Sequence, residues 1–380
     1  MPATARAATA FSIHACGRVL ARAFGAFAAF TAFAMVSVSW AQAQTAPAAP
    51  NPGAASAPAY KMRVVGGLGA LSQYTRWEEP FWSRELSRLS GGKFSAEITP
   101  FDRAGVPGND MLRLLQLGVV PFGTTLMSSL TAQYPQYTAP DLAGLNPDIV
   151  SLRQSLAAFR PYLEKSLRDQ QGVEVLAIYT YPAQVLFCKS PVTGLADLKG
   201  LRIRVSSAGQ SDFVGALGGI AVNTPFAQIV PSFKANGIDC AITGTMAGNT
   251  LELPSMTTHL YPMPLTWGLA IFAANRTAWE GLPSELRALL TRELPKLEAA
   301  VWEESARETQ TGIACNTGAA GCANGKPGSM KLIAISPQDA RRSTEIFQST
   351  VLPRWLQRCG PPCAGIWEQT IGPARAIPLP

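Results

Sequence analysis

The stretch Asp197-Leu198-Lys199-Gly200-Leu201-Arg202-Ile203-Arg204-Val205 decides the fold of this chain. A polar turn with a glycine leads into a short run in which aliphatic residues alternate with arginines. This period of two is typical of a β-strand that carries the two arginines on one face and the aliphatic side chains on the other. Arg204 stands near the carboxyl end of the strand, where ligands bind in open α/β sheets. We therefore expect Arg204 to offer a guanidinium fork to a carboxylate; the alternative is that both arginines face solvent or pair on the sheet surface.

Strand-like and helix-like segments alternate around this stretch. Their order, β-α-β-α-β and then a second unit of the same kind, predicts an α/β fold of helix-covered, mainly parallel sheets. A long helix is predicted over 283–307 and a late strand over 330–335, while His259 is placed in a loop or at a strand end. The other predicted strands cover residues 61–65, 94–99, 119–124, 173–179, 185–189, 200–205, 220–223, 238–243 and 269–274, and a helix covers 78–89.

The amino terminus has the pattern of an export signal. Arginines precede an apolar run over 23–40, and Ala41-Gln42-Ala43 then gives a small-x-small cleavage pattern. We predict a signal peptide over 1–43, cleaved near Ala43, and export to the periplasm; the alternative is a retained membrane anchor. Residues 44–60 are rich in Ala and Pro and carry no charge, which predicts a disordered linker.

The composition excludes several classes of function. Cleavage after Ala43 leaves 29 basic and 25 acidic residues, spread along the chain, which does not suggest nucleic-acid binding. Only one histidine, His259, follows residue 43, so a His-based metal cluster or a Ser-His-Asp triad is not expected unless His259 alone serves. The glycines over 66–69 lack the spacing of a dinucleotide-binding loop. We expect no cofactor, no metal site and no enzymatic activity.

Six cysteines remain in the exported part of the chain, and an even number in an oxidising compartment favours disulfides over zinc. The local pairs Cys315–Cys322 and Cys359–Cys363 are open, as is cross-pairing between those two segments. Cys188 and Cys240 both lie in strand-like runs and are candidate partners.

Several blocks together resemble the solute-binding proteins of tripartite ATP-independent periplasmic (TRAP) transporters, of the C4-dicarboxylate-binding type. They are the stretch over 197–205, the block Ala216-Leu217-Gly218-Gly219, and residues 229–239. The segments 94–100 and 114–120, with Gly105, fit the first lobe of that family. The resemblance covers about residues 61–310.

This resemblance implies a two-lobed, periplasmic-binding-protein-like fold that closes around a ligand, with a long helix spanning the lobes. It implies that Arg204 pairs with a ligand carboxylate. Some relatives carry a second arginine shortly before the strand over 185–189; this chain has Tyr181-Pro182-Ala183-Gln184 there, with Gln184 near the place of that arginine, so a ligand that needs two guanidinium contacts is disfavoured. The implied division of the chain is lobe I over 61–183, lobe II over 184–272, a return strand and spanning helix over 273–312, and a cysteine-containing appendage over 313–380.

Further ligand contacts are expected where loops follow the carboxyl ends of strands. For each polar residue the alternative is an ordinary turn or cap, and for Trp267 it is packing in the core. The candidates beside Arg204 and Gln184 are Gln73, Tyr74, Asp102, Thr124, Tyr181, Ser206, Thr224, Thr243, Asn249 and Trp267.

The sequence therefore predicts a monomeric, extracytoplasmic protein that captures a small organic acid and delivers it to TRAP-type permease subunits. One alternative is an exported hydrolase or lyase, in which a carboxylate pair such as Asp102 with Asp141 does acid–base work. Another alternative is a sensor that reports a ligand bound in the same cleft.

Overall fold

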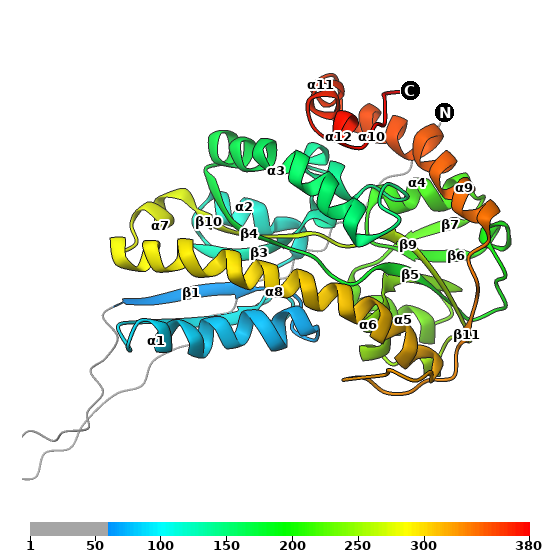
Figure 1. Ribbon diagram of the computed structural model, residues 1–380, viewed down its shortest axis with the longest axis horizontal. Coiled ribbons are helices and arrows are strands. Elements are labelled where there is room, and N and C mark those ends of the chain that lie inside the picture. Colours follow the sequence, from blue (N-terminus) through cyan, green and yellow to red (C-terminus); the bar gives the residue numbers. More distant parts are fainter. Residues whose placement is uncertain (1–59) are drawn as a thin grey trace, which may run out of the picture. The chain divides into compact units, whose positions relative to one another are not determined.

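The computed structural model describes residues 60–380 (Figure 1). The predicted signal peptide and all of the predicted linker except Tyr60 lie outside the described residues. Within the described range, no helix combines the length and the apolar character needed to cross a membrane.

The first sheet has five strands in the order β2-β1-β3-β10-β4. Strand β1 pairs in parallel with β2 and β3, while β10 runs antiparallel to both β3 and β4. One strand, β10, is therefore reversed, and the other four share one direction. The strands are β1 (Tyr60–Gly66), β2 (Phe94–Pro100), β3 (Phe122–Leu126), β4 (Val173–Tyr179) and β10 (Ala270–Asn275).

The second sheet has six strands in the order β11-β9-β5-β8-β6-β7. Here β5 is the reversed strand, because it runs antiparallel to β8 and β9, whereas β6 is parallel to β7 and β8. The strands are β5 (Gln184–Cys188), β6 (Arg202–Val205), β7 (Ile220–Asn223), β8 (Cys240–Gly244), β9 (His259–Thr266) and β11 (Lys331–Leu332).

The chain crosses between the sheets three times: the first two crossings each lead into a reversed strand, and the third runs through α7 and α8 from β10 to β11. It leaves the first sheet after Tyr179 and enters the second at Gln184, then leaves β9 at Thr266 and returns through β10. The long helix α8 runs beside both sheets (Figure 1). Its Trp302 Nε1 donates to the carbonyl of Ile178 in β4, and its Asn316 Nδ2 donates to the carbonyl of Thr245 at the start of α6.

Helices cover both sheets and follow local signals. Asp148 caps α3 by accepting from the Ser151 amide at 2.7 Å, and α3 ends at Gly172, whose φ of +61° suits a glycine. Helical turns η1 (Gln73–Glu78) and η2 (Phe81–Glu85) lead into α1. The helices are α1 (Leu86–Leu89), α2 (Met111–Gln116), α3 (Ile149–Gln171), α4 (Ala208–Ala216), α5 (Ile229–Lys234), α6 (Thr245–Thr250), α7 (Arg276–Glu280), α8 (Ser284–Thr317), α9 (Pro337–Ile346), α10 (Leu352–Cys359), α11 (Pro362–Gln369) and α12 (Ile371–Ala374).

Three element predictions are wrong in detail. Strand β9 was not predicted, because Pro262 and Pro264 lie inside it; beyond Leu260 the described part of β11 no longer pairs with β9, so these prolines cost no hydrogen bond on that edge. Helix α8 continues ten residues past the predicted end, to Thr317, and stops at Gly318 with φ of +71°. The late strand is only two residues long.

The described part of the chain contains three disulfides: Cys188–Cys240, Cys315–Cys322 and Cys359–Cys363. The first joins two paired positions of neighbouring strands β5 and β8. The other two are the local pairs, so the cross-pairing left open by the sequence does not occur.

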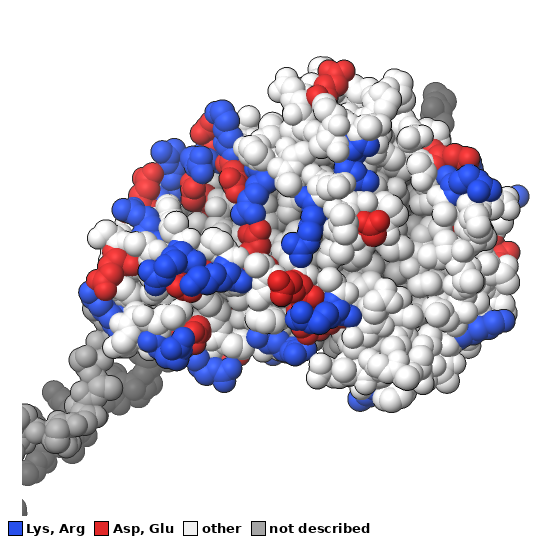
Figure 2. Space-filling view, viewed as in Figure 1, with Lys and Arg blue, Asp and Glu red and all other residues white. Residues whose placement is uncertain are grey.

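Charged side chains on the face shown in Figure 2 alternate in sign along α8 and the segments beside it. No field of a single sign covers that face, which agrees with the mild charge surplus of the sequence.

Candidate ligand-binding site

Arg204 is a buried cation without an acidic partner. It lies in β6 with 4% of its surface exposed. Nε donates to the Thr224 carbonyl at 2.9 Å and Nη1 to the Ile242 carbonyl at 2.7 Å. Among residues 60–380 it forms no ion pair, and Nη2 donates to no atom. Burial lowers the pKa of Arg204 to about 10, so the guanidinium remains charged at neutral pH.

The sheet register places Thr243 on the same face as Arg204. Arg204 pairs with Ala241 of β8, and Thr243 follows two positions later on that strand. Helix α6 covers this face, because a Cβ on its Gly248 would lie 2.2 Å from the ring of Phe187, the β5 neighbour of Ala241. Thr224 contributes its carbonyl, not its hydroxyl, to the guanidinium.

Arg202 has a different environment although it shares the face of Arg204. Its guanidinium pairs with Asp239 at 2.6 Å, and its side chain is 41% exposed. Hydrogen bonds with Arg202 lower the pKa of Asp239. Arg202 is therefore an ion-paired residue at the edge of the sheet. Arg204 is more deeply buried, and its charge has no acidic partner among the described residues.

A cluster of neutral amides and hydroxyls forms at the edge of the second sheet around Gln210. Its Nε2 donates to Gln184 Oε1 at 2.9 Å and to Thr266 Oγ1 at 2.7 Å, and its Oε1 accepts from the Ser206 amide at 2.8 Å. Ser207 caps α4 and fixes the start of the helix that carries Gln210. Gln184 and Ser206, predicted separately, thus meet through a residue that was not predicted.

A buried carboxyl, Glu78, organises the turn after β1 in the first sheet. It accepts from the Gly67 amide at 2.7 Å and from the Thr124 hydroxyl. A Cβ on Gly67 would lie 3.0 Å from both Glu78 Oε2 and the Tyr181 hydroxyl, so the close approach requires glycine. Burial raises the pKa of Glu78 to about 7. Thr124 and Tyr181 are therefore drawn together by Glu78 and Gly67.

Asp141 holds the segment between β9 and β10, where the chain returns to the first sheet. Its carboxylate accepts from the amides of Trp267 at 2.9 Å and Gly268 at 2.7 Å. Burial raises the pKa of Asp141 to about 7. Trp267 is 3% exposed and donates through Nε1 to the Asn146 carbonyl, a placement that favours core packing over a pocket wall. Asp102, exposed at the other sheet, accepts from the Gly69 amide, so these two carboxylates serve separate turns.

The remaining candidates lie elsewhere. Gln73 Nε2 donates to Ser305 of α8, and the ring of Tyr74 packs under Gly66. Asn249 holds the loop after α8, because it donates to the Lys326 carbonyl and accepts from the Lys326 amide. These contacts are structural ones.

Two residues of the site escaped the sequence analysis. Glu78 stands three residues before Phe81 on the buried stripe of the first helix, and an acid at an apolar position is a signal that could have identified it. Gln210 offered no comparable signal, because a polar residue in the first turn of a helix is ordinary.

The model of the family described as bacterial extracellular solute-binding protein, family 7, matches residues 75–348. Several solved structures share the fold. An extracytoplasmic solute receptor of Bordetella pertussis that binds pyroglutamic acid is 22% identical, with 81% of this chain and 98% of that chain covered and a TM-score of 0.71. A TRAP periplasmic solute-binding protein of Desulfovibrio salexigens with bound orotic acid is 16% identical, covering 84% and 99%, with a TM-score of 0.72. One from Sulfurospirillum deleyianum with bound succinate is 16% identical, covering 82% and 98%, with a TM-score of 0.70.

Two α/β sheets joined by three crossings, together with a buried cation that has no acidic partner among the described residues, define a two-lobed solute-binding protein. The chain belongs to the bacterial extracellular solute-binding protein family 7. The resemblance to TRAP solute-binding proteins and the predicted fold class are confirmed. The family is one of extracytoplasmic transport proteins, not a family of enzymes.

Proposed function

We propose that this protein captures a small organic acid between its two lobes, with Arg204 as the carboxylate anchor, and delivers it to TRAP-type permease subunits. It acts in the periplasm as a monomer, without a cofactor and without catalysis, after cleavage near Ala43. The lobes that close on the ligand are those built on the two sheets, divided near Gln184.

The buried and unpaired charge of Arg204 is the observation that carries this proposal. A buried cation without a counterion is costly, and an incoming carboxylate would offset that cost. The two carbonyl acceptors fix the guanidinium plane while Nη2 stays unused within the described residues. Three relatives of the same fold bind pyroglutamate, orotate and succinate, which all carry a carboxylate.

The neutral cluster around Gln184 narrows the ligand class. Gln184 is engaged with Gln210 and supplies no second charge. One charge-assisted contact contributes about 1.5–3 kcal/mol, whereas micromolar affinity requires about 8 kcal/mol. Neutral hydrogen bonds and enclosure must therefore supply the rest, which suits a monocarboxylate or a hydroxy- or keto-acid at least as well as a C4-dicarboxylate.

A thermal-shift screen of organic acids, followed by calorimetry, tests the proposal. The panel contains pyroglutamate, orotate, galacturonate, succinate, lactate and pyruvate. We expect at least one acid to raise the melting temperature, and we expect Arg204→Ala to weaken its binding at least tenfold while Arg202→Ala changes it little. If Arg204→Ala bound the acid with unchanged affinity, Arg204 would not be the carboxylate anchor.

A further inference from the structure

A cavity lies between η1 and α6. Its volume is about 160 Å³, and Arg204 does not line it. One wall comes from Leu71 and Ser72 at the start of η1, and the opposite wall from Met246 and Thr250 of α6. Glu308 of α8 also lines the cavity. The cavity is thus bounded by segments that follow the first sheet, the second sheet and the helix beside both.

One carboxylate oxygen of Glu308 accepts hydrogen bonds, and the other accepts none from the described residues. Oε2 accepts from Ser72 Oγ at 2.6 Å and from Gln73 Nε2 at 3.4 Å. Oε1 accepts no hydrogen bond from residues 60–380, although only 4% of the residue is exposed. Arg76, which also lines the cavity, forms an ion pair with this oxygen at 4.0 Å and donates its hydrogen bond to Glu304. A carboxylate has about four acceptor positions, so Glu308 retains capacity for a strong donor.

Burial raises the pKa of Glu308, because the charged carboxylate loses contact with water. A buried carboxylate of this kind is destabilised unless a donor or a cation reaches it. The hydrogen bonds from Ser72 and Gln73 and the ion pair with Arg76 meet part of this requirement, and Oε1 still accepts no hydrogen bond from the described residues.

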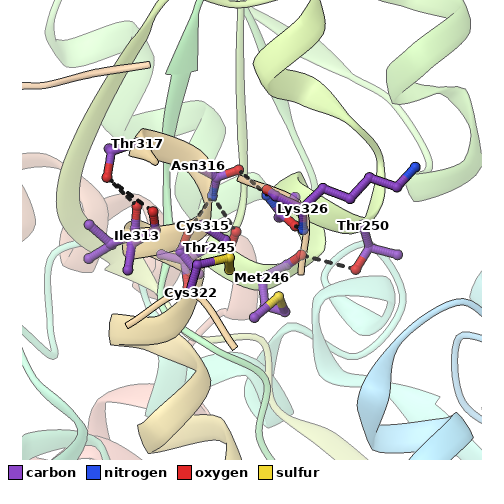
Figure 3. Close-up of a disulfide and its surroundings, with 12 residues drawn as sticks. Thr245, Met246, Thr250, Ile313, Cys315, Asn316, Thr317, Cys322 and Lys326 are labelled. Carbon is purple, nitrogen blue, oxygen red and sulfur yellow. Dashed lines mark hydrogen bonds between the residues drawn. A yellow bond between two sulfur atoms is a disulfide. The ribbon is translucent and has the colours of Figure 1, made fainter. Parts of the chain in front are cut away.

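The part of the lining that α6 contributes includes apolar residues, and α6 is held against α8. Met246 and Ala247 of α6 present methyl and methylene groups, joined by Pro182 from the first crossing. The carbonyl of Thr245 accepts from Asn316 at 2.8 Å, beside the Cys315–Cys322 disulfide (Figure 3). The disulfide ties the end of α8 to the loop that follows it, while the bond from Asn316 and the bond from Thr245 Oγ1 to the Glu308 carbonyl hold α6 against α8. This side of the cavity is therefore built before any ligand arrives.

We propose that this cavity is a second binding site, for a small primary ammonium ion that donates to Glu308 and lays its alkyl chain against Leu71 and Met246. An ammonium group brings three donors, which match Oε1 of Glu308 and the side-chain oxygens of Ser72 and Gln73. An anion is disfavoured by Glu308 itself. A multivalent metal is disfavoured because the described residues contain no group of three or more His, Cys, Asp or Glu side chains that could hold one.

Titration of ethylammonium chloride into the exported chain, against sodium chloride at equal ionic strength, tests this site. Ligand-observed NMR and calorimetry should show saturable binding to the wild type. Glu308→Gln should weaken binding at least tenfold. Glu303→Gln, which removes the same charge from an exposed position of α8, should leave it unchanged.

A second variant keeps the test decisive if Glu308→Gln does not fold. Thr250 is exposed at the cavity wall, so Thr250→Trp fills the cavity without disturbing the core, and binding should be lost. The proposal would be overturned if ethylammonium bound Glu308→Gln or Thr250→Trp as tightly as it binds the wild type. It would also be overturned if sodium chloride gave the same signal as ethylammonium chloride, or if ethylammonium binding to the wild type did not saturate. Arg204→Ala should leave ethylammonium binding intact, which separates failure of this site from failure of the organic-acid site.

Discussion

The Nη1 atom of Arg204 donates to the carbonyl oxygen of Ile242 across 2.7 Å, from β6 to β8. With the bond from Nε to Thr224, this contact fixes the guanidinium plane between two strands. The fold therefore orients the guanidinium before any ligand binds, which is what the proposed contact with a carboxylate requires.

Lysine cannot replace this arginine. An ammonium group keeps the charge of Arg204 but lacks the planar fork that reaches two carbonyls and a ligand together. We expect Arg204→Lys to weaken binding of the organic acid about 10- to 100-fold, measured by calorimetry. Arg202→Lys, at the Asp239 pair on the rim, should change the affinity less than threefold, and a larger loss there would argue against the division between the two arginines.

The buried Glu78 makes stability depend on pH. Its pKa is about 7 in the folded protein and near 4.5 when unfolded, so the folded state keeps the proton that the unfolded state releases between these values. The free energy of unfolding therefore falls as pH rises from about 4.5 to 7, by about 3 kcal/mol from this group, and levels off above 7. Burial also raises the pKa of Asp141, so this group likewise lowers the free energy of unfolding as the pH rises.

Urea unfolding between pH 5 and 8 measures this dependence. Glu78→Gln should flatten the slope, because glutamine releases no proton. Glu79→Gln changes the neighbouring acid and should leave the slope as in the wild type. If the free energy of unfolding of Glu78→Gln fell as steeply with pH as that of the wild type, Glu78 would not be the group responsible.

The three disulfides should differ in their contribution to stability. Cys188–Cys240 closes a span of 52 residues and Cys315–Cys322 a span of 7. From loop entropy, replacing both cysteines by alanine should cost about 4 kcal/mol for the first and about 2.5 kcal/mol for the second. Urea unfolding of the two double variants checks this order, and the reverse order would show that loop entropy does not dominate.

The carboxyl-terminal helices are tied to the second sheet through Asp212 of α4. This buried carboxylate pairs with Arg358 at 2.6 Å and with Arg354 at 3.3 Å, both in α10. Because the arginines are partly exposed, we expect Asp212→Asn to lower the free energy of unfolding by about 1–2 kcal/mol. Glu345→Gln, at the surface pair with Arg342, should change it by less than about 0.5 kcal/mol. Equal effects of the two variants would show that α10 is not anchored by Asp212.

The sequence predicted the sheets well because their strands carry strong local signals. Alternation over 200–205 and the aliphatic run over 173–179 correspond to β6 and β4. Strand β9 was missed because its stability comes from pairing with β5, a long-range contact that overrides the two prolines. Helix α8 was predicted too short because its last ten residues are held by α6 and not by a regular apolar stripe.

The candidate site stands out in the sequence where one residue type is chemically unusual at its position. Arg204 in an aliphatic strand is such a case. Asn249 and Gln73 were placed in the cleft by their position after strands, but their partners, Lys326 and Ser305, lie 77 and 232 residues away. No local pattern encodes such contacts, and the same holds for the cluster around Gln210.

The most direct test compares one acid with its own primary amide. Calorimetric titration of the tightest acid from the panel, and of its amide, into the wild type and into Arg204→Ala isolates the contribution of the carboxylate charge. We predict that the wild type prefers the acid over the amide at least tenfold and that Arg204→Ala loses this preference. A preference of equal size in Arg204→Ala would contradict the central claim that Arg204 anchors the ligand carboxylate.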